Sequence, residues 1–270
     1  MIKMLVLDID GTIIKKDFTY STALKETLLK LQNNGIKVVI ATGRMHGGAV
    51  PLVRELGLHT PIISYQGSMV RNQYENDEIL YSRRMTARQA REVIEYFRAQ
   101  KVHINAYTND KLYVEQDDDL IKEYVNHRYV KYNVIDNLET LDLSKLDKLL
   151  CIENNPIKME KIVNDLSGKH KGELFIVKSM AHYCEVTHPE ATKGKAIEFL
   201  CKYWNINLSE TMAIGDQDND IEMIKTAGIG VAMGNATPKL KENADFITKS
   251  VEEDGALFAI EKFIGVSKYV

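Results

Sequence analysis

The chain has 270 residues and an ordinary globular composition, with 44% hydrophobic and 27% charged residues. Its 35 Lys and Arg against 38 Asp and Glu give a formal charge of -3, which argues against nucleic acid or an anionic membrane surface as the main partner. The first residues lack an apolar segment long enough for a signal peptide or a spanning helix, so we expect a cytoplasmic protein without membrane contact.

Residues 1–82 alternate apolar runs with helical patterns. Ile2 to Leu7 is apolar apart from Lys3, as expected for a strand that is covered on both faces. Further strands are expected at residues 36–41 and 61–65, each preceded by an amphipathic helix that ends at a glycine. Strand and helix in alternation predict a parallel sheet with right-handed crossovers.

The pattern changes at about residue 83. A helix is expected over residues 87–100, and the alternation over 102–115, with a polar turn at Thr108-Asn109-Asp110, predicts a hairpin. A short helix comes next, and then a strand, a helix and two strands are expected at residues 148–152, 156–166, 174–177 and 183–186. Locally paired strands around helices are typical of a small α+β domain.

After Pro189 the alternation of helix and strand returns. A helix over residues 194–203 precedes strands at 211–214 and 229–232, and a final helix is expected over 253–263. We therefore predict an α/β fold with a Rossmann-like parallel-sheet core, residues 1–82 plus 190–270, interrupted by an inserted α+β domain of residues 83–189.

Three cysteines, Cys151, Cys184 and Cys201, are scattered along the chain without a Cys-x-x-Cys pair. Each lies in an apolar pattern, which predicts buried, reduced thiols rather than a disulfide framework or a zinc site.

Asp8 and Asp10 stand at the end of the first predicted strand, two positions apart, before Gly11-Thr12. Side chains alternate along a strand, so both carboxylates leave the same face. Two such charges repel unless a cation lies between them or one carries a proton. A purely local Asx-type turn is the alternative interpretation.

Polar residues also follow other predicted strands or begin a helix, namely Thr42-Gly43, Lys193, Asp216, Asn219 and Asp220. The carboxyl ends of parallel strands are where open α/β sheets bind ligands. Carboxylates suit Mg²⁺, and a hydroxyl, backbone amides and an ammonium suit an anion, so the set predicts a phosphoryl-transfer site. Taken singly, Thr42-Gly43 is explained as a helix cap, Lys193 as a solvated lysine and residues 215–220 as an acidic loop.

Together these segments resemble the haloacid dehalogenase superfamily, whose four motifs are matched in order by residues 8–12, Thr42, Lys193 and residues 215–220. The long insertion resembles the larger, second type of cap domain in that family. Four further segments resemble the Cof-type phosphatases: Ala41-Thr42-Gly43-Arg44, Lys193-Gly194, Val231-Ala232-Met233-Gly234-Asn235-Ala236 and Asp254-Gly255.

The roles that this resemblance implies agree with the chemistry of the residues. Asp8 is expected to attack phosphorus and form an aspartyl-phosphate, and Asp10 to act as general acid and then as general base. Mg²⁺ is expected to be held by Asp8, the backbone carbonyl of Asp10 and Asp216, with Asp220 as a further metal or water-shell ligand. The phosphate oxygens are expected to be bound by Thr42, the Gly43 amide, Lys193 and Asn219.

The chain departs from the family at Gln66-Gly67, where Asn-Gly is frequent, so a ligand contact there is in doubt. Arg44 is interpreted either as a ligand contact or as a salt bridge at a domain interface. Candidate cap residues near the substrate are Arg83, Arg84, Tyr107, Asn109, His182 and Tyr183.

We therefore predict a Mg²⁺-dependent phosphatase of small phosphorylated metabolites, such as sugar phosphates or phosphorylated cofactors, with no obligate protein partner. A sugar phosphomutase on the same core is one alternative, and a phospho-ligand sensor without turnover is another. The core residues do not discriminate between sugar phosphates, phosphorylated cofactors and nucleotides, because all of them present the same phosphate.

Overall fold

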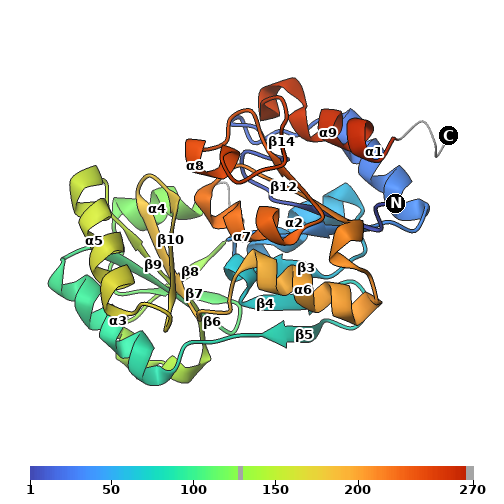
Figure 1. The fold of residues 1–270 in the computed structure, drawn as a ribbon. Helices are drawn as coiled ribbons and strands as arrows, with labels where there is room; N and C mark the ends of the chain where they lie inside the picture. Colours follow the sequence, from blue (N-terminus) through green and yellow to red (C-terminus); the bar gives the residue numbers. More distant parts are fainter. Residues whose placement is uncertain (127–129, 266–270) are drawn as a thin grey trace.

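The computed structural model describes residues 1–126 and 130–265 of the chain. Its strands form a five-stranded sheet, a six-stranded sheet and a three-stranded sheet (Figure 1). None of the helices in these two stretches is both long and apolar enough to span a bilayer.

The five-stranded sheet is parallel throughout, in the order β14-β13-β12-β1-β2. Its strands are β1 (Met4–Leu7), β2 (Lys37–Ile40), β12 (Thr211–Gly215), β13 (Ile229–Ala232) and β14 (Phe246–Ile247). Leu7 lies in register with Ile40 on one side and Ile214 on the other. The carboxyl ends of the three central strands therefore meet at one level, which positions the residues that follow them.

Helices cover both faces of the parallel sheet. On one side α1 (Thr22–Asn33) packs with α9 (Gly255–Phe263), and on the other α6 (Lys193–Trp204) packs with α7 (Ile221–Thr226) (Figure 1). The remaining helices of this part are α2 (His46–Leu56) and the short α8 (Pro238–Lys241). The buried leucines of α1 recur at helical spacing, so the amphipathic pattern explains its packing.

The third predicted strand does not extend the parallel sheet as expected. β3 (Ile62–Ser64) meets it at a single bridge, Ala41 to Ile63, and instead pairs antiparallel with β4 (Met69–Asn72), which pairs with β5 (Glu78–Ser82). The reason is a sharp reversal directly after β3, where Tyr65, Gln66 and Gly67 all have positive φ. The chain turns back locally before it can lengthen the parallel ladder.

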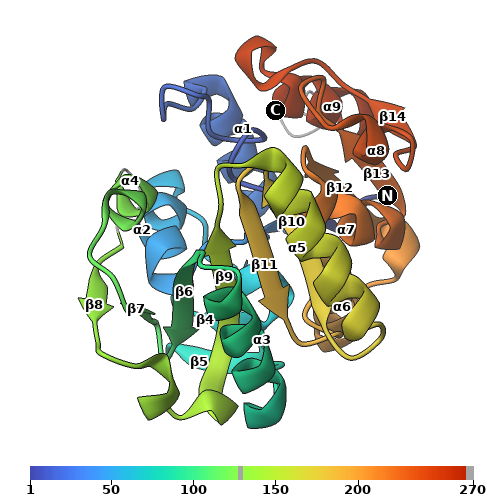
Figure 2. The same ribbon diagram turned by 90° about the vertical axis from the view of Figure 1, so that its left-hand side faces the viewer.

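The six-stranded sheet follows the order β10-β11-β9-β6-β7-β8 and is antiparallel except between β7 and β8. Its strands are β6 (His103–Thr108), β7 (Lys111–Val114), β8 (Tyr132–Val134), β9 (Leu146–Ile152), β10 (Phe175–Met180) and β11 (Tyr183–Thr187). The helices α3 (Ala87–Ala99) and α5 (Pro156–Lys169) cover the face turned away from the parallel sheet, and α4 (Asp119–Val125) lies near one edge (Figure 2). The predicted fold class, a parallel core with an additional α+β part, is confirmed.

We call the region of the six-stranded sheet and its helices the cap, and the part around the parallel sheet the core. The exact division at residues 83 and 189 stays a prediction. The predicted hairpin in the cap is confirmed, because β6 and β7 pair through a turn in which Asn109 and Asp110 have positive φ.

The tip of this hairpin contacts the core. Asp110 Oδ1 accepts hydrogen bonds from the Gly47 amide and from the Tyr65 hydroxyl, each at 2.9 Å. Deeper in the interface, Ser68 Oγ donates to the carbonyl oxygen of Asp147 at 2.8 Å. The inner face of the cap sheet is thereby held over the carboxyl ends of the core strands.

Candidate active site

Asp8 and Asp216 lie at the point where the chain leaves the parallel sheet in opposite directions. Asp8 follows β1 and Asp216 follows β12, which is the neighbour of β1 in the sheet. From β1 the chain proceeds to β2, whereas from β12 it proceeds to β13 on the other side. Loops diverge at such a switch point and leave a crevice between them, which is the usual ligand site of this architecture.

Three buried carboxylates gather in this crevice. Oxygens of Asp8, Asp216 and Asp220 all lie within 4.8 Å of one another. The fully buried Lys193 lies among them, with Nζ 2.5 Å from Asp8 Oδ1 and 2.6 Å from Asp220 Oδ1. The other oxygen of Asp220 accepts the backbone amides of Asp216 and Gln217 at 2.9 and 3.1 Å. Asp220 therefore shapes the loop as well as balancing Lys193.

The positive charge of Lys193 does not balance the three carboxylates of this cluster. Burial raises the pKa of Asp8 to about 7, and the attraction of Lys193 only partly opposes this effect. Burial, reinforced by Asp8 and Asp220, also raises the pKa of Asp216 well above its usual range. Burial works against the charge of Lys193, but Asp220 and Asp8 outweigh it and raise its pKa. One ammonium beside three carboxylates leaves an excess of negative charge, and an all-oxygen donor set fits a hard divalent cation such as Mg²⁺.

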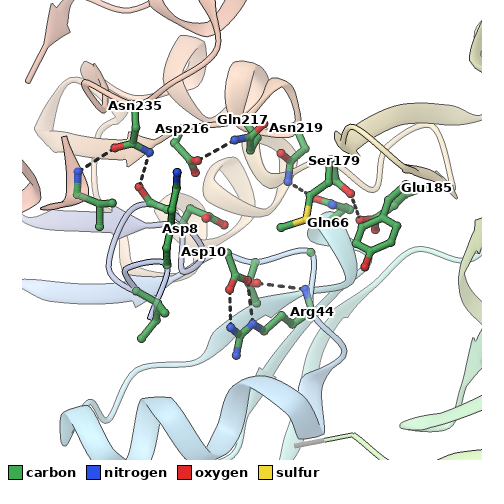
Figure 3. A pocket seen from close by; sticks show the side chains of 18 of the residues that line it. Asp8, Asp10, Arg44, Gln66, Ser179, Glu185, Asp216, Gln217, Asn219 and Asn235 are labelled. Carbon is green, nitrogen blue, oxygen red and sulfur yellow. Dashed lines mark hydrogen bonds and ion pairs between the residues drawn. The ribbon is translucent and has the colours of Figure 1, made fainter. Parts of the chain in front are cut away.

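Gly11 makes the close approach of the two strand ends possible. Its φ is +84°, and a Cβ built on it would lie 2.3 Å from Asp216 Oδ2. Asn235, in the turn after β13, fixes this loop because its Nδ2 donates to the Gly11 carbonyl oxygen at 2.9 Å while its Oδ1 accepts the Val251 amide at 2.8 Å (Figure 3). Asn235 belongs to residues 231–236, which resemble the Cof-type phosphatases, but the sequence did not predict that its side chain holds the Gly11 loop.

Asp10 points away from the carboxylate cluster and is paired with Arg44. Arg44 donates from Nε to Asp10 Oδ2 at 2.9 Å and from Nη2 to Oδ1 at 2.5 Å (Figure 3). The partner of Arg44 is thus a residue of the core, so this contact is not a salt bridge between the core and the cap. Arg44 also lines the cavity, and its interpretation as a ligand contact stays a prediction. The bidentate contact fixes the orientation of the Asp10 carboxylate.

Thr42, Gln66 and Asn219 form a polar wall beside Asp8. Thr42 Oγ1 accepts the Arg44 amide at 3.1 Å. Asn219 Nδ2 donates to Gln66 Oε1 at 2.9 Å, which leaves Gln66 Nε2 and Asn219 Oδ1 buried without a protein partner. A buried amide nitrogen without an acceptor is costly unless a ligand or water supplies one. Gln66 is the residue whose contact with a ligand was in doubt. Its Nε2 has no acceptor in the protein and can donate to a ligand.

Gly67 couples this wall to Lys193. A Cβ on Gly67, whose φ is +105°, would lie 2.2 Å from the carbonyl oxygen of Thr192, the residue that caps the start of α6. Lys193 is the next residue, so the Gln66-Gly67 turn and the ammonium are packed directly against each other.

A cavity of about 550 Å³ opens above these residues and is lined by both parts of the chain. The residues with expected roles in catalysis, phosphate binding or metal binding all line it except Lys193 and Asp220, and Lys193 contacts the lining residue Asp8. The cap contributes Tyr124, Lys148, Leu150, Ser179, Met180, Tyr183 and Glu185.

Of the six candidate cap residues, Tyr183 lines the cavity and the others do not. Arg83 pairs with Glu190, Arg84 pairs with Asp147, and Asn109 forms the hairpin turn. Tyr107 is buried behind the cavity wall, and the ring of His182 contacts that of Tyr183 at a centroid distance of 4.1 Å.

The cap residues that sequence reasoning missed carry one recognisable signal. Lys148 and Glu185 are charged residues inside fully buried strands, β9 and β11, whose residues are mostly apolar. Charged side chains are almost never buried unless they are paired, so such a pattern predicts a buried ion pair.

Comparisons with known proteins agree with this geometry. Residues 5–260 match the family of haloacid dehalogenase-like hydrolases. Phosphatase YwpJ of Bacillus subtilis is 26% identical to this chain, and the match covers 94% of this chain and 96% of YwpJ. The 5-amino-6-(5-phospho-D-ribitylamino)uracil phosphatase YwtE of the same organism is 27% identical, with 97% of this chain and 98% of YwtE covered. A haloacid dehalogenase-like hydrolase of known structure from Bacteroides thetaiotaomicron is 29% identical, covers 97% of this chain and 99% of its own, and has a TM-score of 0.85. The chain belongs to the haloacid dehalogenase-like hydrolases and is a phosphatase of small phosphorylated compounds.

Proposed function

We propose that this phosphatase is Mg²⁺-dependent and hydrolyses phosphate monoesters through an aspartyl-phosphate formed on Asp8. One observation carries the proposal: Asp8 lies in the cavity floor, within a buried cluster of three carboxylates that contains a single ammonium. Such a cluster is ready to receive both a divalent cation and a dianionic phosphate, whose charges offset each other.

Asp8 and Asp216 would hold the cation, together with the backbone carbonyl of Asp10. Asp220 would take part from the outer side, because both its oxygens already accept bonds from Lys193 and the loop amides. When bound, Mg²⁺ supplies positive charge that reduces the repulsion between the Asp8 carboxylate and the phosphate.

The reaction proceeds in two displacements at phosphorus. In the first, an Asp8 oxygen forms a bond to phosphorus while the bond to the leaving oxygen breaks and Asp10 gives that oxygen a proton. In the second, water attacks phosphorus, the bond to Asp8 breaks, and Asp10 receives the proton of the water. The Arg44 contacts fix the orientation of the Asp10 carboxylate, which lines the cavity.

The equatorial phosphate oxygens would be bound by Thr42, the Gly43 amide, Lys193 and Asn219. Gln66 joins this set, because its buried Nε2 lacks an acceptor in the protein. Donors fixed in advance around the phosphate stabilise the charge that spreads over these oxygens in the transition state.

Two assays separate this proposal from its alternatives. A phosphomutase would convert a sugar phosphate to its isomer without release of inorganic phosphate, and a sensor would bind phosphate esters without turnover. We would measure phosphate release over a panel of metabolites that includes the phosphorylated ribitylaminouracil in the name of YwtE. Isomer formation without phosphate release would overturn the proposal.

Removal of divalent cations is expected to abolish phosphate release, and Mg²⁺ to restore it. Ca²⁺ should substitute poorly, because its larger and looser coordination shell misplaces the attacking carboxylate. The measurement is the rate of phosphate release in metal-free buffer and after titration with each ion. Full activity in excess chelator, with metal content measured as nil, would contradict the expectation.

Replacement of Asp10 with Asn should affect substrates unequally. A general acid matters most when the leaving group is poor, so the rate with an alkyl phosphate should fall by at least about tenfold more than the rate with p-nitrophenyl phosphate. Comparison of kcat/KM for the two esters tests this difference. Equal losses with both esters would show that Asp10 does not protonate the leaving group.

A further inference from the structure

The helix α2 begins without a capping side chain of its own. Its N-cap residue is the apolar Met45, and its first turn, His46 to Ala49, contains no acidic residue. The first four amides of a helix have no partner within the helix, and a polar or acidic side chain just before it usually accepts one of them. Because α2 follows Thr42-Gly43 closely, its uncapped start belongs to the surroundings of the proposed phosphate site.

The cap supplies the missing acceptor. Asp110, in the turn between β6 and β7, accepts the Gly47 amide of the first turn of α2 at 2.9 Å through Oδ1. Gly47 leaves room for this contact, since a Cβ built on it would lie 3.0 Å from Asp110 Oδ2. The dipole of the helix also favours a carboxylate at this end. Asp110 therefore acts on α2 as an N-cap residue does, but from the cap.

The same oxygen of Asp110 also holds the segment that carries Gln66. It accepts the hydroxyl of the buried Tyr65 at 2.9 Å, and burial together with Asp110 raises the pKa of Tyr65 well above its usual value, so that this hydroxyl stays a donor. The Tyr65 amide donates to the Arg44 carbonyl at 2.9 Å, and the Gln66 amide donates to the Thr42 carbonyl at 3.2 Å. The segments of Thr42 and Gln66 are thus joined to each other, and both are fastened to Asp110.

A further contact from the cap lies at the beginning of the α2 segment. Lys148 Nζ lies 2.6 Å from Glu185 Oε2 and donates to the Gly43 carbonyl oxygen at 2.7 Å. The residues from Gly43 to Gly47 are therefore held by the cap at both ends. Asp110 itself lies outside the cavity lining, so any effect that it has on a bound phosphate must pass through these segments of the core.

We propose that Asp110 is a positioning residue for the phosphate site: as the N-cap of α2 and the partner of Tyr65, it fixes Thr42-Gly43 and Gln66 in the geometry that binds the transferring phosphate. The inference rests on the proposed function, because it concerns the donors that are assigned there to the phosphate. Every ester presents the same phosphate to these donors. The contact should therefore affect inorganic phosphate and all esters alike, whatever alcohol leaves.

The variant Asp110→Gly tests the inference. Asn109 and Asp110 both have positive φ, and Asn-Gly is a preferred sequence for such a two-residue turn, so the variant removes the carboxylate and keeps the hairpin. We expect kcat/KM to fall by about 10- to 100-fold, the range spanned by loss of a hydrogen bond to a charged group and by a 1 Å misplacement of reacting groups. The factor should be the same for p-nitrophenyl phosphate and glucose 6-phosphate, and the inhibition constant of inorganic phosphate should rise by about tenfold or more.

Three matched variants accompany it. Asp110→Asn tolerates the positive φ and keeps an oxygen that can accept from Gly47 and Tyr65, so its kcat/KM should stay within about fivefold of the wild type. Tyr65→Phe removes one of the two bonds from the core side and should lower kcat/KM for both esters alike, by about threefold or more. Asn109→Gly changes the exposed neighbour in the same turn and should alter neither the rate nor the inhibition constant.

Amide hydrogen exchange distinguishes disorder of the α2 start from a general loss of stability. Exchange in residues 42–49 should be about tenfold or more faster in Asp110→Gly than in the wild type, whereas α5 in the cap keeps its wild-type rate. Unchanged exchange in residues 42–49, or a loss of activity confined to one ester, would overturn the inference and leave the proposed function intact. Wild-type enzyme that releases phosphate from neither ester would contradict the proposed function, and the inference with it.

Discussion

Replacement of Asp8 with Asn is expected to lower kcat/KM for any phosphate ester by roughly four orders of magnitude or more, as for other single nucleophile knockouts. The amide has the shape of the carboxylate but cannot form the bond to phosphorus. Rates of phosphate release at saturating Mg²⁺ measure the loss. Asp165→Asn, which changes an exposed carboxylate on α5 of the cap, is the control and should retain the wild-type rate.

The Asp8→Asn protein should be no less stable than the wild type when metal is absent. Because the pKa of Asp8 is raised from 3.8 to about 7 in the fold, its contribution to stability is lost as the pH rises through that interval. Asn carries no charge to desolvate, so its melting temperature near pH 7 should equal or exceed that of the wild type. Near-normal turnover by this folded variant would exclude Asp8 as the nucleophile.

Replacement of Lys193 with Met is expected to have the second largest effect. The change would remove one proposed donor to the transferring phosphate, which should lower kcat by about 100- to 1000-fold. It also leaves Asp8, Asp216 and Asp220 without their ammonium, and removal of one partner of a buried ion pair costs about 3–5 kcal/mol in the free energy of unfolding.

The loss of stability in Lys193→Met should depend on metal. Mg²⁺ restores positive charge among the three carboxylates, so the deficit in melting temperature should shrink when Mg²⁺ is added. Lys195→Met is the control, because Lys195 lies two residues further along α6, is exposed and pairs with Glu198. Equal deficits with and without Mg²⁺ would contradict the electrostatic role of Lys193.

Most of the core site could be predicted from the sequence because a parallel sheet brings distant strand ends to one edge. Once Leu7 and Ile214 are placed at the ends of neighbouring strands, Asp8 and Asp216 must be close. The pairing of Arg44 with Asp10 could not be predicted in this way. It depends on the course of the loops that follow β1 and β2, which the spacing of polar and apolar residues does not encode.

The cap side of the cavity was less predictable for a different reason. Whether Lys148 points into the cavity or away from it depends on which face of the six-stranded sheet α3 and α5 cover. Of the two helices, α3 lies far from Lys148 and Glu185 along the chain, and the alternation in a fully buried strand is too weak to identify its inner face. The error at β3 has a local origin, because nothing in Tyr65-Gln66 by itself demands two successive residues with positive φ.

Any outward swing of the cap sheet must break the bonds that Asp110 forms with Gly47 and Tyr65. Both bonds end on the same carboxylate oxygen, so they are lost together rather than one after the other. Closure of the cavity would then be a two-state event, with the shut and open arrangements separated by a barrier instead of a graded path. The residue after Tyr65 is Gln66 in the polar wall beside Asp8, so under the proposed function the rate at which inorganic phosphate leaves would be set in part at a hairpin tip that never contacts it.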